Sequence, residues 1–305
     1  MNRARWGWVV FLALILGVAS DSIACWGTRP LSMGGAFSAV SDDVHGIYWN
    51  PAGLTGVKHF DLTYSRWLSR RDIVNYDDFA AGALSLGICT LGVGLTCNHD
   101  KKNEWSNPRY KRYVINKEED RYVNCGCGVS LGKALSLGLN INTIKTDYQG
   151  TDVKSGVPFT CSDDTYLLDL GLLWKVGSGI SLGVLAQNLN EPRMYYPEIM
   201  KGEIYIFNLR PGIAWRPVKN IVLAADVYDA LNNSRGDRDV RLGMEARALD
   251  SLVIRLGRYH VFDSKLRADT AGFGWKFAGW KVDYGCMYWE TIADVQHMLA
   301  LGYAY

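Results

Sequence analysis

The sequence lacks two features that would place it in a common class. Beyond Cys25 it has no apolar run near the ~20 residues that a membrane-spanning helix needs. It also lacks an excess of one charge, because 33 Lys and Arg stand against 31 Asp and Glu, and no basic patch is present. These absences argue against a polytopic helical membrane protein and against a nucleic-acid partner.

Residues typical of catalytic and metal centres are scattered. The five histidines are spread along the chain, and we expect no strand-to-helix elbow that presents a serine nucleophile. Cys125 and Cys127 are one residue apart, which is too close for a zinc knuckle, and no partner pair with histidine follows. We therefore expect no catalytic residues, no metal ligands and no cofactor, and not an enzyme.

The N-terminus has the layout of a secretory signal peptide. Two arginines precede the apolar run Trp8 to Ala19, and Ser22 and Ala24 stand at −3 and −1 to a cut before Cys25. We assign residues 1–24 to this signal. An N-terminal membrane anchor is the alternative, which the short apolar run disfavours. Cys25 could also be the acylated residue of a lipoprotein, although the leucine usual at −3 is missing.

From residue 57 onward the chain repeats one pattern of alternating apolar and polar residues. Leu137, Leu139 and Ile141, for example, alternate with glycine and asparagine. Successive side chains of a strand point to opposite faces, so each run has one apolar face and one polar face. A lipid-facing outside and a polar interior have this pattern, which predicts an all-β, transmembrane antiparallel β-barrel over 57–305.

About fourteen such runs are present, an even number as expected for a single-chain bacterial barrel. They cover residues 57–68, 77–88, 91–99, 121–132, 136–147, 163–175, 180–188, 203–216, 220–229, 238–248, 252–259, 267–277, 280–289 and 296–305. Long polar connections alternate with short ones. Outer-membrane barrels have long outer loops and short periplasmic turns, so we expect both termini on the periplasmic side.

Aromatic residues support the membrane location. The chain has 11 Trp and 17 Tyr, which interfacial girdles of a barrel would use. Its last strand ends on Tyr305, with Leu299, Leu301 and Tyr303 on the same face. This ending resembles the terminal signal that the barrel-assembly machinery reads. We expect that machinery and outer-membrane lipid to be partners of the chain.

Residues 25–56 lack the alternation and are rich in small residues. Gly34 and Gly35 permit positive φ or close backbone approach. Asp42 or Asp43 is placed to cap a short helix toward Trp49. The turn-forming residues are Asn50, Pro51 and Gly53, with Gly53 placed to end the turn. Such a compact segment suits a hatch, or plug, inside the barrel lumen.

This stretch resembles the N-terminal region of FadL-like outer-membrane proteins, including the PorV/PorQ branch. The matching residues are Met33, Gly34, Gly35, Ala36, Phe37, Ala39, Val40, Asp42, Asp43, Tyr48, Trp49, Asn50, Pro51, Ala52, Gly53 and Leu54. The resemblance implies an N-terminal hatch and, as in FadL-type members, diffusion of hydrophobic molecules through the barrel. The chain is short for such a transporter and its outer loops are modest.

Charged residues recur on the strand face opposite the apolar one. They are Asp169, Lys175, Arg210, Arg216, Arg241, Glu245, Arg247, Arg255, Lys281 and Asp283. One interpretation is that they pair with one another and with the hatch. The other is that the arginines line a route for an anionic head group, such as a carboxylate, through bidentate contacts.

The cysteines leave one pairing open. Cys97 and Cys125 flank the 100–120 connection and share the lipid-facing parity, so a hairpin centred near Tyr110 or Lys111 would place them roughly opposite. A disulfide between them is compatible with this register. The other interpretation treats Cys125 and Cys127 as small apolar residues on one sheet face.

The function predicted from the sequence is passive uptake of hydrophobic or amphipathic small molecules, such as fatty acids, across the bacterial outer membrane. A secretion-associated barrel of the PorV kind, which binds a secreted protein or a translocon of type IX secretion, is the alternative. A purely structural surface barrel is a third. Outer-membrane phospholipases and proteases are barrels too, so the fold alone does not exclude an enzyme.

Overall fold

The computed structural model describes residues 26–69, 76–100, 105–106, 113–197, 201–233, 238–260, 262, 267–290 and 294–305. The predicted signal peptide, residues 1–24, and Cys25 lie outside the described residues. So do parts of several predicted long loops. Among the residues described, no helix is long and apolar enough to cross a membrane.

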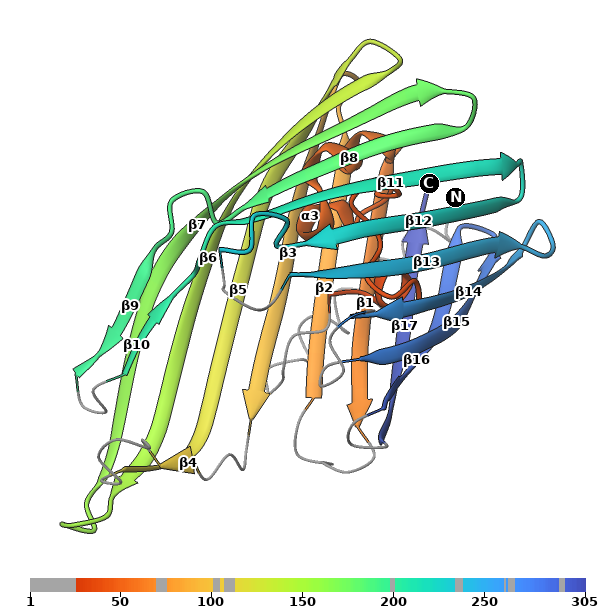
Figure 1. The fold of residues 1–305 in the computed structure, drawn as a ribbon. Coiled ribbons are helices and arrows are strands. Elements are labelled where there is room, and N and C mark those ends of the chain that lie inside the picture. The colour runs from red at the N-terminus through yellow and green to blue at the C-terminus, as the bar shows by residue number, and fades with distance from the viewer. Residues whose placement is uncertain are drawn as a thin grey trace, which may run out of the picture.

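The main sheet is antiparallel and closes on itself (Figure 1). Its wall strands are β1 (Phe60–Ser69), β2 (Tyr76–Ser85), β3 (Cys89–Asp100), β5 (Tyr113–Leu131), β6 (Leu135–Asp152), β7 (Pro158–Gly177), β8 (Ile180–Gln187), β11 (Asn208–Val218), β12 (Ile221–Tyr228), β13 (Asp239–Arg247), β14 (Leu252–Tyr259), β15 (Ala268–Phe277), β16 (Trp280–Trp289) and β17 (Asp294–Ala304). The pairings of β1 with β17 and of β3 with β5 complete the ring. Each wall strand therefore has two hydrogen-bonded neighbours, as a lipid environment requires.

The predicted antiparallel barrel and its fourteen runs are confirmed, but three strands are longer than predicted. Strands β5, β6 and β7 extend into the predicted connections 100–120 and 148–162. A two-residue strand, β4 (Trp105–Ser106), pairs with β5. A separate hairpin forms from β9 (Arg193–Tyr196), inside the predicted loop 189–202, and β10 (Lys201–Ile204), which overlaps the start of the predicted run 203–216. The wall strand of that run, β11, begins only at Asn208. Backbone pairing continues in the extended part of β5 through charged residues such as Lys117, Glu118 and Glu119, so the apolar–polar alternation that reveals a strand in sequence is interrupted.

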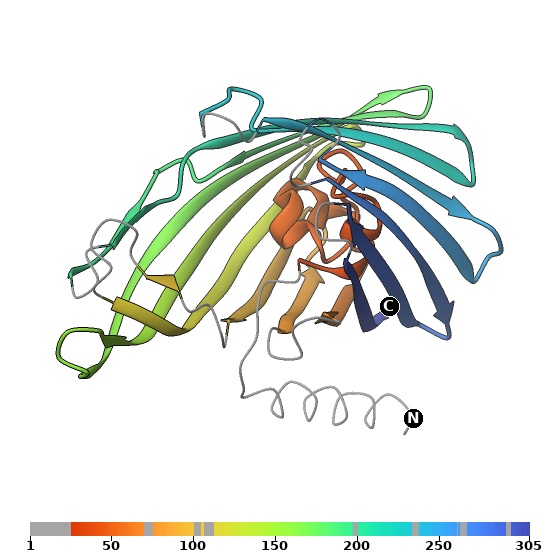
Figure 2. The same ribbon diagram turned by 60° about the horizontal axis from the view of Figure 1, so that its bottom comes forward.

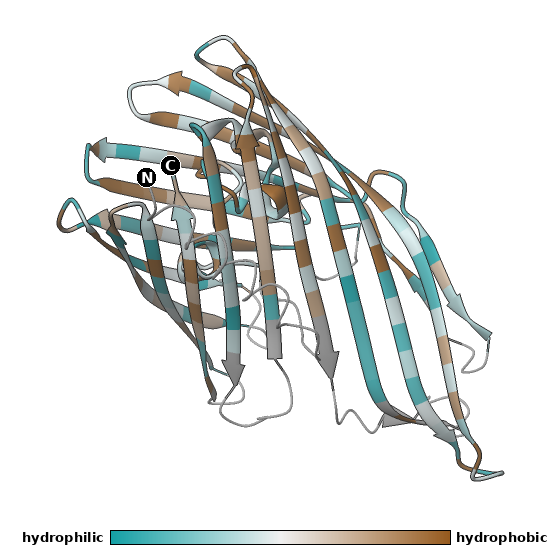
Figure 3. Ribbon diagram, turned by 180° about the vertical axis from the view of Figure 1, so that it is seen from behind, coloured by the Kyte–Doolittle hydropathy of each residue, from teal (hydrophilic) through white to brown (hydrophobic). Residues whose placement is uncertain are grey.

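Hydrophobic and hydrophilic residues alternate along many of the wall strands (Figure 3), and their side chains lie on opposite sides of the wall. On β6, Leu137, Leu139 and Ile141 are 41–50% exposed, whereas the intervening Asn140 and Asn142 are buried inside the ring. Large exposed apolar side chains on other strands include Leu91, Val93, Leu95, Leu170, Ile213, Leu242, Ile254, Leu256, Phe273 and Leu299. The outer surface of the barrel therefore suits hydrocarbon.

Aromatic side chains gather where the short turns lie. Phe60 stacks with Tyr303 at 5.7 Å between ring centroids, and Trp280 meets Tyr303 edge-on at 5.2 Å. Phe60 and Tyr305 also exchange backbone hydrogen bonds of 3.0 and 3.2 Å, which join the first strand to the last. This arrangement resembles one of the two aromatic girdles of membrane barrels.

Residues 26–57, called the lumenal segment below, lie inside the ring (Figures 1 and 2). The segment contains α2 (Thr28–Ser32), α3 (Gly46–Trp49) and the 3₁₀ helix η1 (Pro51–Gly56). Its apolar side chains form most of the main hydrophobic cluster: Leu31, Met33, Ala36, Phe37, Ala39, Val40, Val44, Ile47, Trp49, Leu54 and Val57. Full burial of each large apolar side chain contributes about 1.5–3 kcal/mol, so the segment is a packed core.

Candidate functional site

Close backbone approach seats the lumenal segment against the wall. Gly34 and Gly35 have φ of +62° and +72°, as the sequence suggested. A Cβ atom on Gly34 would lie 2.5 Å from the carbonyl oxygen of Leu242. Glycines of the wall strands also allow the two backbones to approach closely. A Cβ on Gly138 would lie 2.2 Å from the nitrogen of Ala52. The role of these wall glycines was not predicted from the sequence, although they occupy the polar face of the strands.

Asn50 and Pro51 start η1 as predicted. The Asn50 side chain accepts a hydrogen bond from the nitrogen of Ala52 at 3.2 Å. Its amide nitrogen donates to the carbonyl oxygens of Ser38 at 2.8 Å and of Leu172, on β7, at 3.0 Å. The expectation for Gly53 is wrong, because η1 continues to Gly56. Gly53 instead lets the backbone pack on Ser41, whose Oγ would lie 2.1 Å from a Cβ.

The predicted helix cap at Asp42 or Asp43 is also wrong. The N-cap of α3 is His45, which makes no capping hydrogen bond through its side chain. Asp43 accepts hydrogen bonds from the backbone nitrogen of His45 and from its Nδ1, both at 2.9 Å, and so orders the turn before the helix. Both carboxylates are placed mainly by Arg29.

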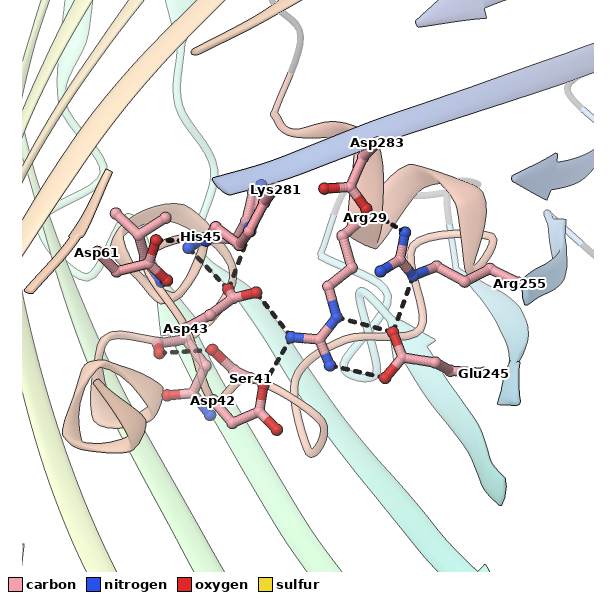
Figure 4. A network of polar contacts seen from close by, with 12 residues as sticks. Arg29, Ser41, Asp42, Asp43, His45, Asp61, Glu245, Arg255, Lys281 and Asp283 are labelled. Carbon is pink, nitrogen blue, oxygen red and sulfur yellow. Dashed lines mark hydrogen bonds and ion pairs between the residues drawn. The ribbon is translucent and has the colours of Figure 1, made fainter. Parts of the chain in front are cut away.

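Arg29 is the centre of an ion network that joins the lumenal segment to the wall (Figure 4). Its Nη1 lies 2.6 Å from both Asp42 and Asp43, and its Nε and Nη2 reach Glu245 of β13 at 2.8 and 3.0 Å. Glu245 in turn accepts from Arg255 of β14 at 2.8 Å. We call these residues, with Asp283, the Arg29 network.

The Arg29 network continues to two further strands. Arg255 contacts Asp283 of β16 at 2.5 Å. Lys281, also on β16, pairs beside it with Asp61 of β1. Bidentate arginine–carboxylate contacts are among the strongest hydrogen bonds in proteins. Together they fix the segment to strands from distant parts of the sequence.

The surroundings of Arg29 and Asp43 in the lumenal segment favour the charged forms of both side chains. Burial opposes the charge on Arg29, but Asp42, Glu245 and Asp43 outweigh burial and raise its pKa well above the usual value. Burial likewise opposes the charge on Asp43, yet His45 and Arg29 hold its pKa well below 3.8. Both groups are therefore ionised at neutral pH.

Acid is expected to weaken the ionic contacts that hold the lumenal segment against the barrel wall. Because the pKa of Asp43 is lowered in the folded protein, its contribution to stability is complete above about pH 5 and decreases as the pH falls through 3.8 toward the folded pKa. Protonation removes its attraction to Arg29, His45 and Lys281. Protease cleavage within the segment, measured from pH 7 to pH 2.5, should rise below pH ~4. Asp43→Asn should show a smaller rise with acid, and an unchanged profile would contradict this role.

Other polar wall residues hold the segment through its backbone. Asp226 of β12 accepts hydrogen bonds from the nitrogens of Phe37 at 3.0 Å and of Ser38 at 2.8 Å. Asn140 donates to the carbonyl oxygen of Ile47 at 2.5 Å. Asp169 lies apart: it accepts from Asn142 at 2.5 Å and from the nitrogen of Asn188 at 2.8 Å. Asp226 and Asn140 were missed because polarity alone does not reveal a backbone partner.

Two buried arginines form a second cluster, nearer the ends of the strands that carry the long loops. The Arg241 guanidinium lies 4.3 Å from the ring centre of Tyr228 and 4.2 Å from that of Tyr259. Arg210 lies 4.4 Å from the Tyr228 ring and donates to Asn208 at 3.3 Å. Within the described residues neither guanidinium makes an ion pair. We call Arg210, Arg241, Tyr228 and Tyr259, with Tyr48, the arginine–tyrosine cluster.

Tyr48 brings the lumenal segment into this cluster. Its ring stacks on Trp26 at 4.6 Å with an interplanar angle of 7°. Burial raises the pKa of Tyr48 to about 12, with Arg210 acting in the opposite direction. The surface of the segment that faces the long-loop ends thus combines aromatic rings with two cations that lie over tyrosine ring faces.

Six of the ten charges predicted to face the lumen therefore separate into groups. Glu245 and Arg255 belong to the Arg29 network, and Arg216 lies 3.7 Å from Asp42 at its edge. Arg210 and Arg241 belong to the arginine–tyrosine cluster, whereas Asp169 orders a loop. The interpretation that the charges pair with one another and with the hatch holds for the Arg29 network. Arg210 and Arg241 make no ion pair with a carboxylate of the described residues, so they are the arginines that are compatible with a route for an anion.

Two serines occur in Gly-x-Ser-x-Gly segments, at residues 128–132 and 179–183. Ser130 lies one residue before the end of β5, ahead of the turn into β6, and Ser181 lies in β8. A nucleophile elbow needs a sharp strand-to-helix turn, which neither segment has. These serines are therefore parts of the barrel wall.

The proposed Cys97–Cys125 pairing is wrong. Cys97 lies opposite Arg121, and Cys125 lies opposite Val93. The two cysteines are thus offset by four positions, or ~13 Å along the strands, which is too far for a disulfide. The hairpin is centred nearer residue 109 than 111, a difference that the sequence pattern did not resolve. Cys97 and Cys125 are both free cysteines.

Known structures share this fold. No protein-family model and no curated protein sequence matches the chain. The toluene transporter TbuX of Ralstonia pickettii superimposes with a TM-score of 0.70 at 12% identity, covering 92% of this chain and 98% of that one. The toluene transporter TodX of Pseudomonas putida gives 0.62 at 11%, covering 90% and 97%. A FadL homologue of Pseudomonas aeruginosa gives 0.62 at 10%, covering 94% and 98%. The chain therefore has the fold of these barrels.

Proposed function

We propose that this chain is an outer-membrane channel for passive uptake of hydrophobic or amphipathic small molecules. The observation that carries the proposal is a lipid-compatible barrel whose lumen is filled by a segment held by a small set of ion pairs. A barrel of this size can enclose a channel, and a filled lumen makes passage controllable. Similarity to structures described as toluene transporters supports the same class.

The proposal includes the cellular location of the chain and the removal of its signal peptide. Export would remove residues 1–24, place the long loops outside the cell and leave both termini in the periplasm. Tyr305, paired with Phe60 at the ring closure, would present the assembly signal. The lumenal segment would act as the hatch of the channel, and the chain would have no catalytic role.

Uptake into liposomes tests the proposal directly. The full chain should accelerate entry of toluene and of a labelled fatty acid compared with protein-free liposomes. A barrel variant in which a disulfide joins the lumenal segment to the wall should not accelerate the entry of either solute. If the folded chain passes no hydrophobic solute, the channel proposal is wrong.

The arginine–tyrosine cluster should discriminate between acids and neutral molecules. Removing both cations with Arg210→Gln and Arg241→Gln should slow entry of benzoate by roughly tenfold and change toluene entry by less than about twofold, because only the anion gains from an arginine contact. Paired uptake assays with the two solutes measure this. Arg258→Gln is the control, since Arg258 is already paired with Asp269 at 3.1 Å. Equal slowing of both solutes would show that the cluster is structural.

A secretion-associated barrel of the PorV/PorQ kind is the second candidate. The observation favouring it is the extension of β5, β6 and β7 beyond the other strands, with the β9–β10 hairpin packed on them through Met194 and Tyr196. We propose that this extension would be the surface that a protein partner contacts. Co-purification of a secreted protein with a chain that transports no solute would favour this candidate.

A further inference from the structure

A cavity of about 460 Å³ lies at the short-turn end of the barrel, between the lumenal segment and the wall. Its lining carries eight cationic and five acidic side chains. Apolar side chains, among them Phe60, Val222 and Val253, also line it. The cavity is therefore both cationic and partly apolar.

The acids of the cavity are already paired. Glu245, Asp42 and Asp43 contact Arg29. Asp283 contacts Arg255, and Asp61 contacts Lys281. Each of the five carboxylates thus has a cation in contact.

Other cations remain without such a partner. Four cations of the lining make no ion pair with a carboxylate of the described chain: Lys58, Lys219, Arg247 and Lys276. The surplus of positive charge is therefore built into the lining, in addition to the network that seats the segment.

The placement of Lys276 is the most informative feature. It lies directly opposite Lys281 in the β15–β16 pairing, and both lysines line the cavity. Like charges directly opposite on neighbouring strands destabilise a sheet. Arg29 lines the same cavity and adds a further positive charge to it. An anion bound beside Lys276 would offset this repulsion.

We propose that the cavity binds an oxyanion, with Lys276 and Arg247 as its principal contacts. A carboxylate or a phosphate satisfies the lysine and the arginine equally, and the apolar part of the lining suits a small ring or chain attached to a carboxylate. The inference deepens the proposed function, on which its biological meaning rests: acidic permeants would meet this site at the short-turn mouth.

Calorimetric titration of the full chain in a non-ionic detergent tests the site. The probes are sodium benzoate, inorganic phosphate and neutral benzyl alcohol. Benzoate should bind saturably, and Lys276→Gln with Arg247→Gln should weaken that binding at least tenfold. Benzyl alcohol should bind far more weakly and be insensitive to the variant. Phosphate binding as tight as that of benzoate identifies a general oxyanion site, and weaker phosphate binding identifies one for organic acids.

The matched control removes two positive charges at the same end of the barrel. Lys133→Gln with Lys175→Gln alters exposed side chains that do not line the cavity, and benzoate affinity should change by less than twofold. Equal weakening in control and test variants, or no saturable binding of either anion, would overturn the proposal. The Lys276 variant should fold, because it relieves repulsion, and heat-dependent migration in SDS verifies this.

The outcomes separate this site from the proposed channel. Benzoate binding without solute uptake would refute the channel and retain the site. Uptake by a chain that binds neither anion would refute the site and retain the channel.

Discussion

Deletion of residues 29–54, with the export signal retained, should convert a barrel that conducts little into an open pore. The deleted residues supply most of the side chains that fill the lumen, so the ring would enclose water. We expect single-channel conductance in planar bilayers to rise at least roughly tenfold over the full chain. The large effect follows from the loss of a packed core inside a wall that keeps its own hydrogen bonds.

Two controls make this result interpretable. The deletion variant should retain a β-type circular dichroism spectrum and heat-dependent migration in SDS, because wall pairing does not depend on the segment. If it fails to assemble, Gly138→Leu is the substitute, since its side chain would collide with the backbone at Pro51 and Ala52 and displace the segment. A folded variant with parental conductance would refute the idea that the segment blocks the pore.

Arg29→Met should loosen the lumenal segment more than any other single change of charge. It leaves Asp42, Asp43 and Glu245 without their shared cation. Removing one partner of a buried ion pair costs about 3–5 kcal/mol, and the slight exposure of Arg29 favours the lower value. A loss of about 3 kcal/mol raises the open population roughly a hundredfold. Frequent opening events in single-channel records and faster proteolysis of the segment should result.

A compensating variant tests whether charge causes this effect. Arg29→Gln combined with Asp43→Asn and Glu245→Gln removes charges of both signs and keeps groups of similar shape, so it should restore much of the closed state. Arg258→Gln, which affects a pair at the rim, should leave the conductance unchanged. Openings as frequent in the compensated variant as in Arg29→Met would show that packing by the arginine side chain matters more than its charge.

The sequence by itself determined the wall of this protein. Alternation with period two requires only that one face of each strand meets lipid and the other does not, so it is visible residue by residue, as in Leu137 to Asn142. The fourteen runs and the positions of the short turns follow from that local rule. The conformations of Gly34 and Gly35 and the start of η1 at Asn50 and Pro51 are also local, and the sequence indicated each of them.

Only the tertiary structure decided which residues meet across the lumen. Arg29 and Glu245 are 216 positions apart, and nothing local marks them as partners. The closed barrel brings them together, and it also places Arg210 and Arg241 against tyrosine rings of other strands. Strand register is equally non-local: a hairpin centre misplaced by two residues separates Cys97 from Cys125 by four positions. Alternation specifies the face on which a side chain lies, whereas its neighbours depend on register and closure, which the whole barrel determines.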